Sequence, residues 1–299
     1  MRLKAGLSLL LISIIWGSAF VAQRVAGQQG SVYWFNAARY LLAALVVLPF
    51  ALRVTQGAKL PYPRAQYQWM FIAGFVLFVG SAAQQAGLVY TTAGNAGFIT
   101  SLYVVFVPLV LFLLWREKVH WISILAVALA GTGAFFLSTG GRFEIRIGDV
   151  IEIFGALFWT LHVIVLGKYA SNFEALSFSV GQLAVCGLLN LSVGLFTEKS
   201  MSLNLPLLIA IVYTAFFSLG LCYTLQVWAQ RQTPPTDAAL LLSLESVFAV
   251  ISGWLVLDEK LAPIQIFGCV LIFVAVLLSQ FKEWNLRGKM DSTHLVEGR

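Results

Sequence analysis

Residues 237–266 read DAALLLSLESVFAVISGWLVLDEKLAPIQI. Apolar side chains dominate as far as Leu257, and the run ends in three consecutive charges, Asp258, Glu259 and Lys260. A helix needs about 20 apolar residues to cross the hydrocarbon core of a bilayer, and this run has that length. The stretch therefore predicts a membrane-spanning helix with one carboxylate, Glu245, inside the span.

The composition of the whole chain resembles that of this run. Of 299 residues, 60% are hydrophobic and 11% are charged, whereas soluble domains carry about 25% charged residues. Lipid must therefore be the main solvent, and in lipid only helices and closed barrels satisfy the backbone. Because the runs are long and apolar on all sides, we predict an all-α integral membrane protein with ten transmembrane helices. They cover residues 6–26, 33–52, 67–90, 95–115, 119–139, 148–170, 175–196, 206–230, 236–257 and 263–281.

Lysine and arginine predict the orientation. With the N-terminus in the cytoplasm, the inside segments hold twelve of these residues and the outside segments five, and such residues accumulate on the cytoplasmic side. We therefore expect a multi-pass protein of the cytoplasmic (inner) membrane with both termini cytoplasmic. No small-residue cleavage site follows the first run, so we interpret it as a retained helix and not as a signal peptide.

The chain also repeats itself. Residues 95–124 read NAGFITSLYVVFVPLVLFLLWREKVHWISI and align with the opening stretch at a shift of 142 residues, which pairs Glu117 with Glu259 at the same helix end. A unit of five helices is odd, so the second copy enters the membrane from the opposite side, as in the inverted repeats of secondary transporters. We predict a first five-helix repeat at 1–145, a second, inverted one at 146–282, and a polar, aperiodic cytoplasmic tail at 283–299.

Four segments resemble one family. IIWGSAFVAQRVA (14–26), ARYLLAAL (38–45), YTTAGNAGFITSLYVVFVPL (90–109) and LSLESVFAVISGWLVLDEKL (242–261) are similar to the EamA-type transporters of the drug/metabolite transporter superfamily. The resemblance implies two inverted five-helix halves around a central substrate cavity, in proteins that mostly export small polar metabolites, often amino acids. The second half departs at Trp159-Thr160, where the first half has Trp16-Gly17.

Polar side chains within the spans are the candidates for function. A charged residue at the centre of a helix costs about 2.5–3.5 kcal/mol on insertion scales, so it usually faces a cavity or a partner. At 1.5 Å per residue, Glu245 lies about 14 Å from the cytoplasmic start of its span and His162 about 21 Å from the outer start of its own. Two interpretations stay open for each: Glu245 handles the solute or a proton, or is a structural acid; His162 does the same, or hydrogen-bonds a backbone carbonyl.

Four other residues carry structural expectations. We expect Arg39, two turns from the outer side, to extend to the outer interface. Two interpretations stay open for Glu152: it belongs to a polar-aromatic stripe with Gly155, Trp159 and His162 at helical spacing, or it is solvated one turn from the outer surface. Pro108 removes a backbone donor and should bend its helix. Gly97 should allow close helix packing.

The predicted function is secondary transport of a small polar organic metabolite, an amino acid or similar, by alternating access and in the direction of export. Aromatic side chains would hold the apolar part of the solute, and polar ones would bind the rest. Glu245 and His162, which can each take up a proton, are also the candidates for ion or proton coupling. The predicted substrate-binding residues are Trp16, Gln84, Tyr103, Trp159, His162, Tyr223 and Glu245.

Other classes of protein lack support in the sequence. The Gly-Lys pairs, at 167–168 and 288–289, lack the context of a phosphate-binding loop, and neither a zinc-protease motif nor a serine nucleophile motif occurs. The basic residues are scattered, so the net charge of +6 does not indicate nucleic acid. We expect no cofactor, no metal and no enzymatic activity; the partners are the solute, the bilayer and a coupled proton. The alternatives are an importer of a sugar or other metabolite, an intramembrane enzyme and a scaffold subunit.

Overall fold

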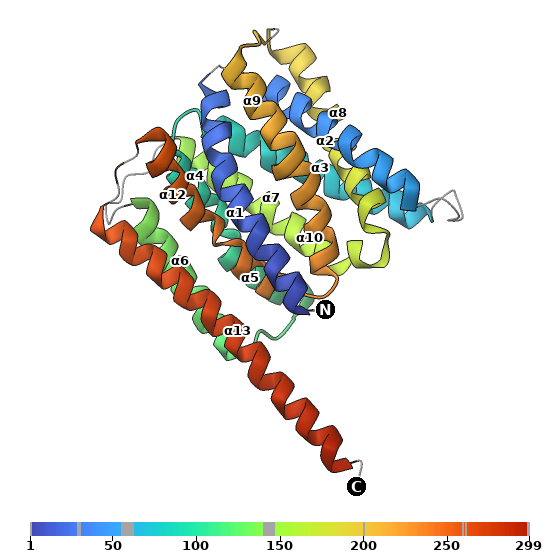
Figure 1. Ribbon diagram of the computed structural model, residues 1–299, viewed down its shortest axis with the longest axis vertical. Helices are drawn as coiled ribbons and strands as arrows, with labels where there is room; N and C mark the ends of the chain where they lie inside the picture. Colours follow the sequence, from blue (N-terminus) through green and yellow to red (C-terminus); the bar gives the residue numbers. More distant parts are fainter. Residues whose placement is uncertain are drawn as a thin grey trace.

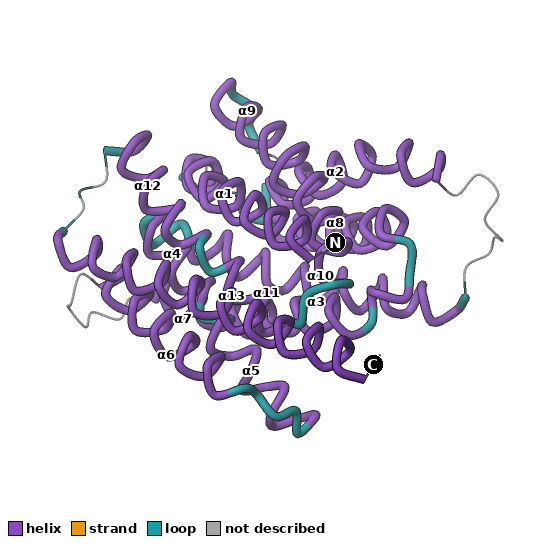
Figure 2. The backbone as a smooth tube through the Cα atoms, turned by 60° about the horizontal axis from the view of Figure 1, so that its bottom comes forward, coloured by secondary structure: helices purple, strands orange, loops and turns teal. Residues whose placement is uncertain are grey.

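The computed structural model describes residues 2–28, 31–54, 63–139, 147–199, 201–258, 260 and 262–297, which form a bundle of helices (Figures 1 and 2). Within these ranges all regular structure is helical and no strand occurs. The elements are α1 (Arg2–Gly27), α2 (Tyr33–Val54), α3 (Arg64–Gly87), α4 (Ala93–Ser101), α5 (Tyr103–Trp115), α6 (Trp121–Thr139), α7 (Ile147–Lys168), the 3₁₀ turn η1 (Ala170–Asn172), α8 (Ala175–Thr197), α9 (Leu205–Tyr213), the π-helical η2 (Thr214–Leu221), α10 (Cys222–Gln230), α11 (Pro235–Leu242), α12 (Glu245–Leu257) and α13 (Pro263–Glu297).

Ten helical segments of the described chain correspond to the predicted spans. Eight have the length and hydropathy to cross a membrane, and three of these eight are made of successive elements: α4–α5, α9–η2–α10 and α11–α12. The remaining two, α6 and α13, contain shorter apolar stretches at Trp121–Leu137 and Pro263–Ser279. The prediction of an all-α membrane protein with ten such helices is confirmed.

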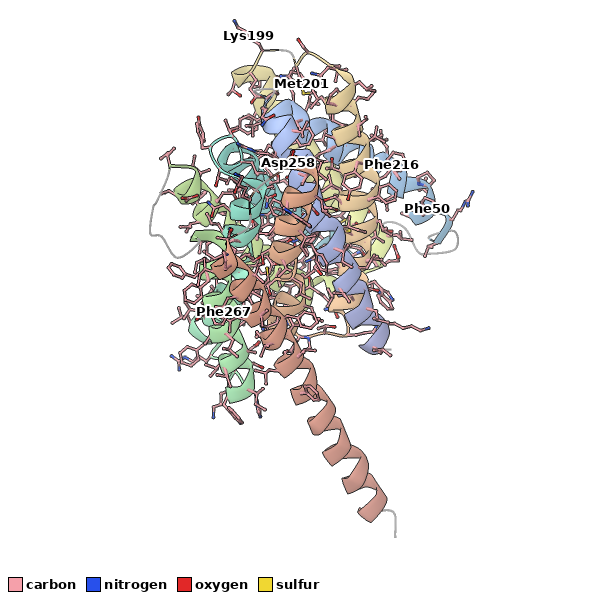
Figure 3. The ribbon with its side chains drawn as sticks, turned by 60° about the vertical axis from the view of Figure 1, so that its left-hand side comes forward. Phe50, Lys199, Met201, Phe216, Asp258 and Phe267 are labelled. Atoms are coloured by element: carbon pink, nitrogen blue, oxygen red, sulfur yellow. The ribbon has the colours of Figure 1, made fainter. Side chains whose placement is uncertain are left out.

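Large apolar side chains cover the outside of the bundle. Phe50, Phe216 and Phe267 project outward from α2, η2 and α13 (Figure 3) and are between 43% and 56% exposed. Exposed apolar surface of this extent is not found on soluble monomers, and lipid is the solvent that it fits.

The last helix is longer than the sequence predicts. α13 continues beyond its apolar stretch to Glu297 and projects away from the bundle (Figure 1). Residues 283–297, for which we expected no periodic structure, are therefore helical.

Two spans are interrupted near their middle. α4 and α5 meet at Leu102, and α11 and α12 meet at Leu244; at both leucines the backbone N–H bonds to a carbonyl three residues back, which tightens the turn. The first break lies six residues before Pro108, and the bend expected at this proline stays a prediction. The break also recurs at Leu244, and α12 contains no proline, so proline is not its cause.

The ends of these two spans share a second feature. Arg116 and Asp258 directly follow α5 and α12 and have positive φ angles of 54° and 53°, the left-handed values among the described non-glycine residues. Like the two breaks, they are 142 residues apart. Asp258 lies at the end of α12 (Figure 3), whereas Glu259 is outside the described residues. The opposed orientation of the two halves stays a prediction.

Helices from the two halves pack against each other. α2 lies beside α8, α3 beside α7, α6 beside α13, and α12 beside both α1 and α4 (Figure 1). Gly17 brings α1 directly onto the break in α11–α12, because a Cβ atom at this position would lie 2.7 Å from the carbonyl oxygen of Glu245. The small residue therefore sets how closely α1 approaches the first turn of α12.

We predict that Gly97→Leu impairs folding and transport. A Cβ atom at Gly97 would lie 2.6 Å from Cβ of Ala249 on α12, so even the first added carbon separates α4 from α12. Overpacking of this kind costs about 1–3 kcal/mol or more. Thermal unfolding in detergent should show a lower midpoint, whereas Gly6→Leu, at a glycine with open space around it, should unfold like the parent. A Gly97→Leu protein with the parent's stability would contradict the close packing of α4 on α12.

Candidate substrate cavity

A cavity lies within the bundle, where the two interrupted spans approach α1, α2, α3, α7 and α10. All seven residues that the sequence predicts to bind substrate line this one cavity. Their role in binding stays a prediction, but their assembly at one place is an observation. The lining residues are Trp16, Phe20, Gln23, Arg39, Tyr40, Gln84, Thr100, Tyr103, Trp159, His162, Val163, Ser218, Leu219, Tyr223, Gln226 and Glu245.

The two helix breaks place Glu245 and Tyr103 at the cavity. Each is the first residue of the second part of its span, α12 and α5, and they lie beside each other across the wall. Glu245 is 3% exposed, and its Oε1 atom has no hydrogen-bond partner within the described chain. Because Glu245 begins a helix, its carboxylate lies at the positive end of the α12 dipole, which favours negative charge there.

Arg39 is the main correction to the sequence analysis. The expectation that it extends to the outer interface is wrong, because its side chain is 1% exposed and lines the cavity. Its Nε atom donates to Oδ1 of Asn36 at 3.0 Å. The guanidinium carbon lies 4.9 Å from the ring centre of Phe35 and 5.2 Å from that of Tyr40. Two aromatic faces and one amide thus hold a cation in the interior.

Neither Arg39 nor Glu245 has an oppositely charged partner among the described side chains. Among the described residues, neither side chain makes an ion pair, and Nη2 of Arg39 has no hydrogen-bond partner. A buried charge without a partner is costly, and the cost is offset only when a ligand or neighbour pairs with it. The cavity therefore presents a guanidinium group and a carboxyl group that are both open to a solute.

Aromatic rings form one wall of the cavity. The ring centre of Tyr223 lies 5.2 Å from that of Trp16 and 5.5 Å from that of His162, and Trp159 follows at 6.1 Å from His162. The indole N–H of Trp16 donates to the carbonyl oxygen of Ser218 at 2.7 Å. Ser218 belongs to the π-helical segment η2, a type of helix found mostly at functional sites.

His162 is held by a side chain and not by the backbone. Its Nε2 atom lies 2.9 Å from Oε1 of Gln182, so the interpretation that it binds a backbone carbonyl is wrong. Since an amide oxygen can only accept, Nε2 carries the hydrogen and Nδ1 is the acceptor of a neutral ring. Nδ1 has no partner in the described chain and is available to a donor in the cavity.

The sequence analysis also missed polar residues that line the cavity. Gln226 has no hydrogen-bond partner within the described residues on either amide atom, although both atoms are buried. Buried polar atoms are nearly always paired in native proteins, so their concentration around this cavity indicates a polar ligand. Helical spacing could have found Gln226, which follows Tyr223 by three residues on the same face.

Comparisons with known proteins agree with this architecture. The model of the EamA-like transporter family matches residues 3–139 and again residues 146–281. An uncharacterized transporter of Archaeoglobus fulgidus is 35% identical over 93% of this chain and 86% of its own length. The uncharacterized inner membrane transporter YedA of Escherichia coli K12 is 26% identical over 91% and 89%. A crystal structure at 14% identity superimposes with a TM-score of 0.77 over 92% of this chain and 98% of that one, which supports the fold alone.

Proposed function

The chain belongs to the EamA-like transporter family and is a multi-pass membrane transporter, and on that premise we propose that it moves a small zwitterionic metabolite, an amino acid or a similar solute. The proposed membrane is the cytoplasmic membrane, the proposed direction is export, and both termini are placed in the cytoplasm. The segments that this orientation places in the cytoplasm hold more lysine and arginine residues than those it places outside, and this excess supports the orientation.

The observation that carries the proposal is the pair of unpaired charges on one cavity. Arg39 offers a planar fork of donors that suits a carboxylate, and Glu245 accepts hydrogen bonds from an ammonium group. A zwitterion satisfies both side chains at once, whereas a neutral sugar satisfies neither charge. The aromatic wall of Trp16, Trp159 and Tyr223 would contact the apolar part of the solute.

The proposed mechanism is alternating access around this fixed site. Interrupted helices near the middle of the membrane are a recurrent feature of secondary transporters, in which two halves move against each other around the substrate. The breaks at Leu102 and Leu244 support such a movement, because each separates a span into two shorter helices. Without a phosphate-binding loop in the sequence, the energy would come from the gradient of the solute or of a coupled ion.

Counterflow in liposomes tests the proposed substrate class. Full-length protein is reconstituted into liposomes loaded with an unlabelled mixture of the twenty common L-amino acids, and the same mixture, radiolabelled, is added outside. We expect label to enter beyond the level of protein-free liposomes, and chromatography of the trapped label to identify the solute. Exchange of labelled hexoses in place of amino acids would support the sugar alternative. A comparison of the medium of cells with and without the protein tests the direction.

A further inference from the structure

Glu152 is a second buried acid beside the substrate cavity. Of the two interpretations of this residue, solvation at the outer surface is wrong, because the side chain is 1% exposed. Its carboxyl group packs against Gly87 of α3, where a Cβ atom would lie 2.5 Å from its Cγ and 2.8 Å from its Oε1. The position of this side chain therefore requires a residue without a Cβ at position 87. Oε1 has no hydrogen-bond partner among the described residues.

A hydroxyl group links Glu152 to the substrate cavity. Thr100, which lines the cavity, lies with its Oγ1 3.5 Å from Oε2 of Glu152. The same Oγ1 accepts a hydrogen bond from Nε2 of Gln84 at 2.9 Å. Because the threonine oxygen accepts from the amide, its own hydrogen is free to point to the carboxylate.

A second acid links Glu152 to the start of α7. Asp149 is one helical turn away on the same helix and is 8% exposed. Its Oδ1 accepts hydrogen bonds from Nδ2 of Asn95 at 2.6 Å and from Thr91 at 3.5 Å. Asp149 thus lies in the first turn of α7, Glu152 lies one turn further along the helix, and Thr100 lies between Glu152 and the cavity.

No positive charge faces Glu152 from the helices packed on it. Of the described side chains, α3 presents Gln84 and Gly87 and α4 presents Thr100, and Asp149 is its charged neighbour. Arg24 of α1 donates instead to the carbonyl oxygens of Leu88 and Val89. Tyr90, after α3, packs on Gly148. Among the described residues this carboxylate therefore has no counter-charge, and its desolvation is relieved by a proton.

We propose that Glu152 binds the proton that couples transport, and that Asp149 and Thr100 connect it to the outer solution and to the cavity. This proposal rests on the proposed transport function and adds a residue other than Glu245 and His162. A proton passes from water to Asp149 and then to the Glu152 carboxylate. Once Glu152 is protonated, the Thr100 hydroxyl turns its hydrogen from Glu152 to the cavity and accepts from the carboxyl O–H. Glu152 then transfers its proton to Oγ1 of Thr100 while the threonine releases its original hydrogen to water or solute in the cavity, so each transfer breaks one O–H bond and forms another.

The donor set favours a proton over a metal ion. Within the described chain, no three His, Cys, Asp or Glu side chains gather at one place. A single carboxyl group with one relay hydroxyl is sufficient for a proton and insufficient for a metal ion.

Glu152→Gln should separate coupling from substrate binding. In liposomes with the labelled L-amino-acid mixture, counterflow needs no net proton movement and should stay within about twofold of the parent. Uptake driven by a pH gradient should fall by about tenfold or more. Glu174→Gln, at an acid that caps α8, is the matched control and should retain both activities. Gradient-driven uptake by Glu152→Gln at the parent rate would overturn the proposal, as would loss of both activities or a parent that exchanges solute without responding to the gradient.

Protonation of Glu152 can also be measured without any solute, so the proposed proton site can be tested independently of the proposed substrate class. The acid-induced infrared difference spectrum of the purified protein should contain a carboxyl band that Glu152→Gln removes and that Thr100→Val shifts. If the amino-acid mixture is not exchanged but this band is present, the proposed substrate class fails and the proton site stands. A spectrum that Glu152→Gln leaves unchanged overturns the proton site, whatever the transport result.

Discussion

Glu245→Gln should abolish transport of the amino-acid mixture while the protein still inserts and folds. Glutamine keeps the shape of the side chain and one acceptor oxygen, but it cannot pair with an ammonium group as an ion. Removing one member of a buried, hydrogen-bonded charge pair costs about 2–5 kcal/mol, which corresponds to a loss of affinity of roughly 30-fold or more. Counterflow rates measured over a range of solute concentrations give the loss directly.

Two comparisons make this result specific. Glu198→Gln is the matched control: Glu198 accepts hydrogen bonds from the backbone N–H groups of the first residues of α2 and does not line the cavity, so counterflow should persist. Butyrate has a carboxylate but no ammonium group. Its affinity for the solute site, measured as inhibition of counterflow, should therefore be the same in the parent and in Glu245→Gln. A fully active Glu245→Gln protein would return Glu245 to a structural role.

Glu245→Gln and Glu152→Gln should differ in which transport activities they lose. Glu245→Gln should lose both counterflow and gradient-driven uptake, because the solute no longer binds. Glu152→Gln should lose only the gradient-driven part. The same pattern for both variants would mean that one carboxyl group serves both solute and proton, or that Glu152 acts on the cavity through packing.

The sequence identified the spans and the inward-facing residues because both depend on local pattern. Trp16, Gln84 and Glu245 stand out as polar or amphipathic side chains in apolar runs, and insertion cost alone directs them to a cavity. Distance along the helix places Glu245 at mid-membrane without any knowledge of its neighbours. These properties require no long-range contact, which is why the sequence is sufficient for them.

Arg39 and Glu152 were misjudged because distance from the membrane surface does not determine exposure. Both lie within about two turns of a predicted helix end, where a solvated side chain is the ordinary case. Their burial results from packing between halves: α2 lies against α8, and Gly87 of α3 lets the carboxyl group of Glu152 fit beneath it. Such contacts join residues distant in sequence and have no periodic signature in a single chain.

The two halves are similar in backbone and different in chemistry at the cavity. The aligned positions Tyr103 and Glu245 both follow a helix break, but one is a phenol and the other a carboxylate. The shared break explains why both side chains reach the cavity. The difference places a carboxyl group on one side of the cavity only, so the proposed zwitterionic solute would be held in one orientation and not in the reverse.

Arg39→Met should abolish transport and leave stability nearly unchanged. Methionine fills a similar volume without a charge. Burial of the Arg39 charge, two turns into α2, costs at most the value of about 2.5–3.5 kcal/mol that insertion scales give for a helix centre, and the variant recovers this cost. Against this, Oδ1 of Asn36 loses the donor that Arg39 supplies at 3.0 Å, at a cost of about 1–3 kcal/mol. The two terms nearly cancel, so the thermal midpoint should move by only a few degrees. Loss of the guanidinium group that would pair with the carboxylate of the solute should weaken solute binding by about 2–5 kcal/mol.

Arg24→Met is the matched control, since Arg24 donates to backbone carbonyl oxygens at the end of α3 and does not line the cavity. It should unfold at a lower temperature and keep counterflow, the reverse of the pattern for Arg39→Met.

The transport activity of Arg39→Lys should lie between those of the parent and Arg39→Met, because lysine keeps the charge but cannot form the two parallel hydrogen bonds of a guanidinium group. Propylamine, which lacks a carboxylate, should inhibit parent and Arg39→Met equally. If Arg39→Met unfolds early while its surviving fraction transports normally, Arg39 is a structural cation and the solute binds without it.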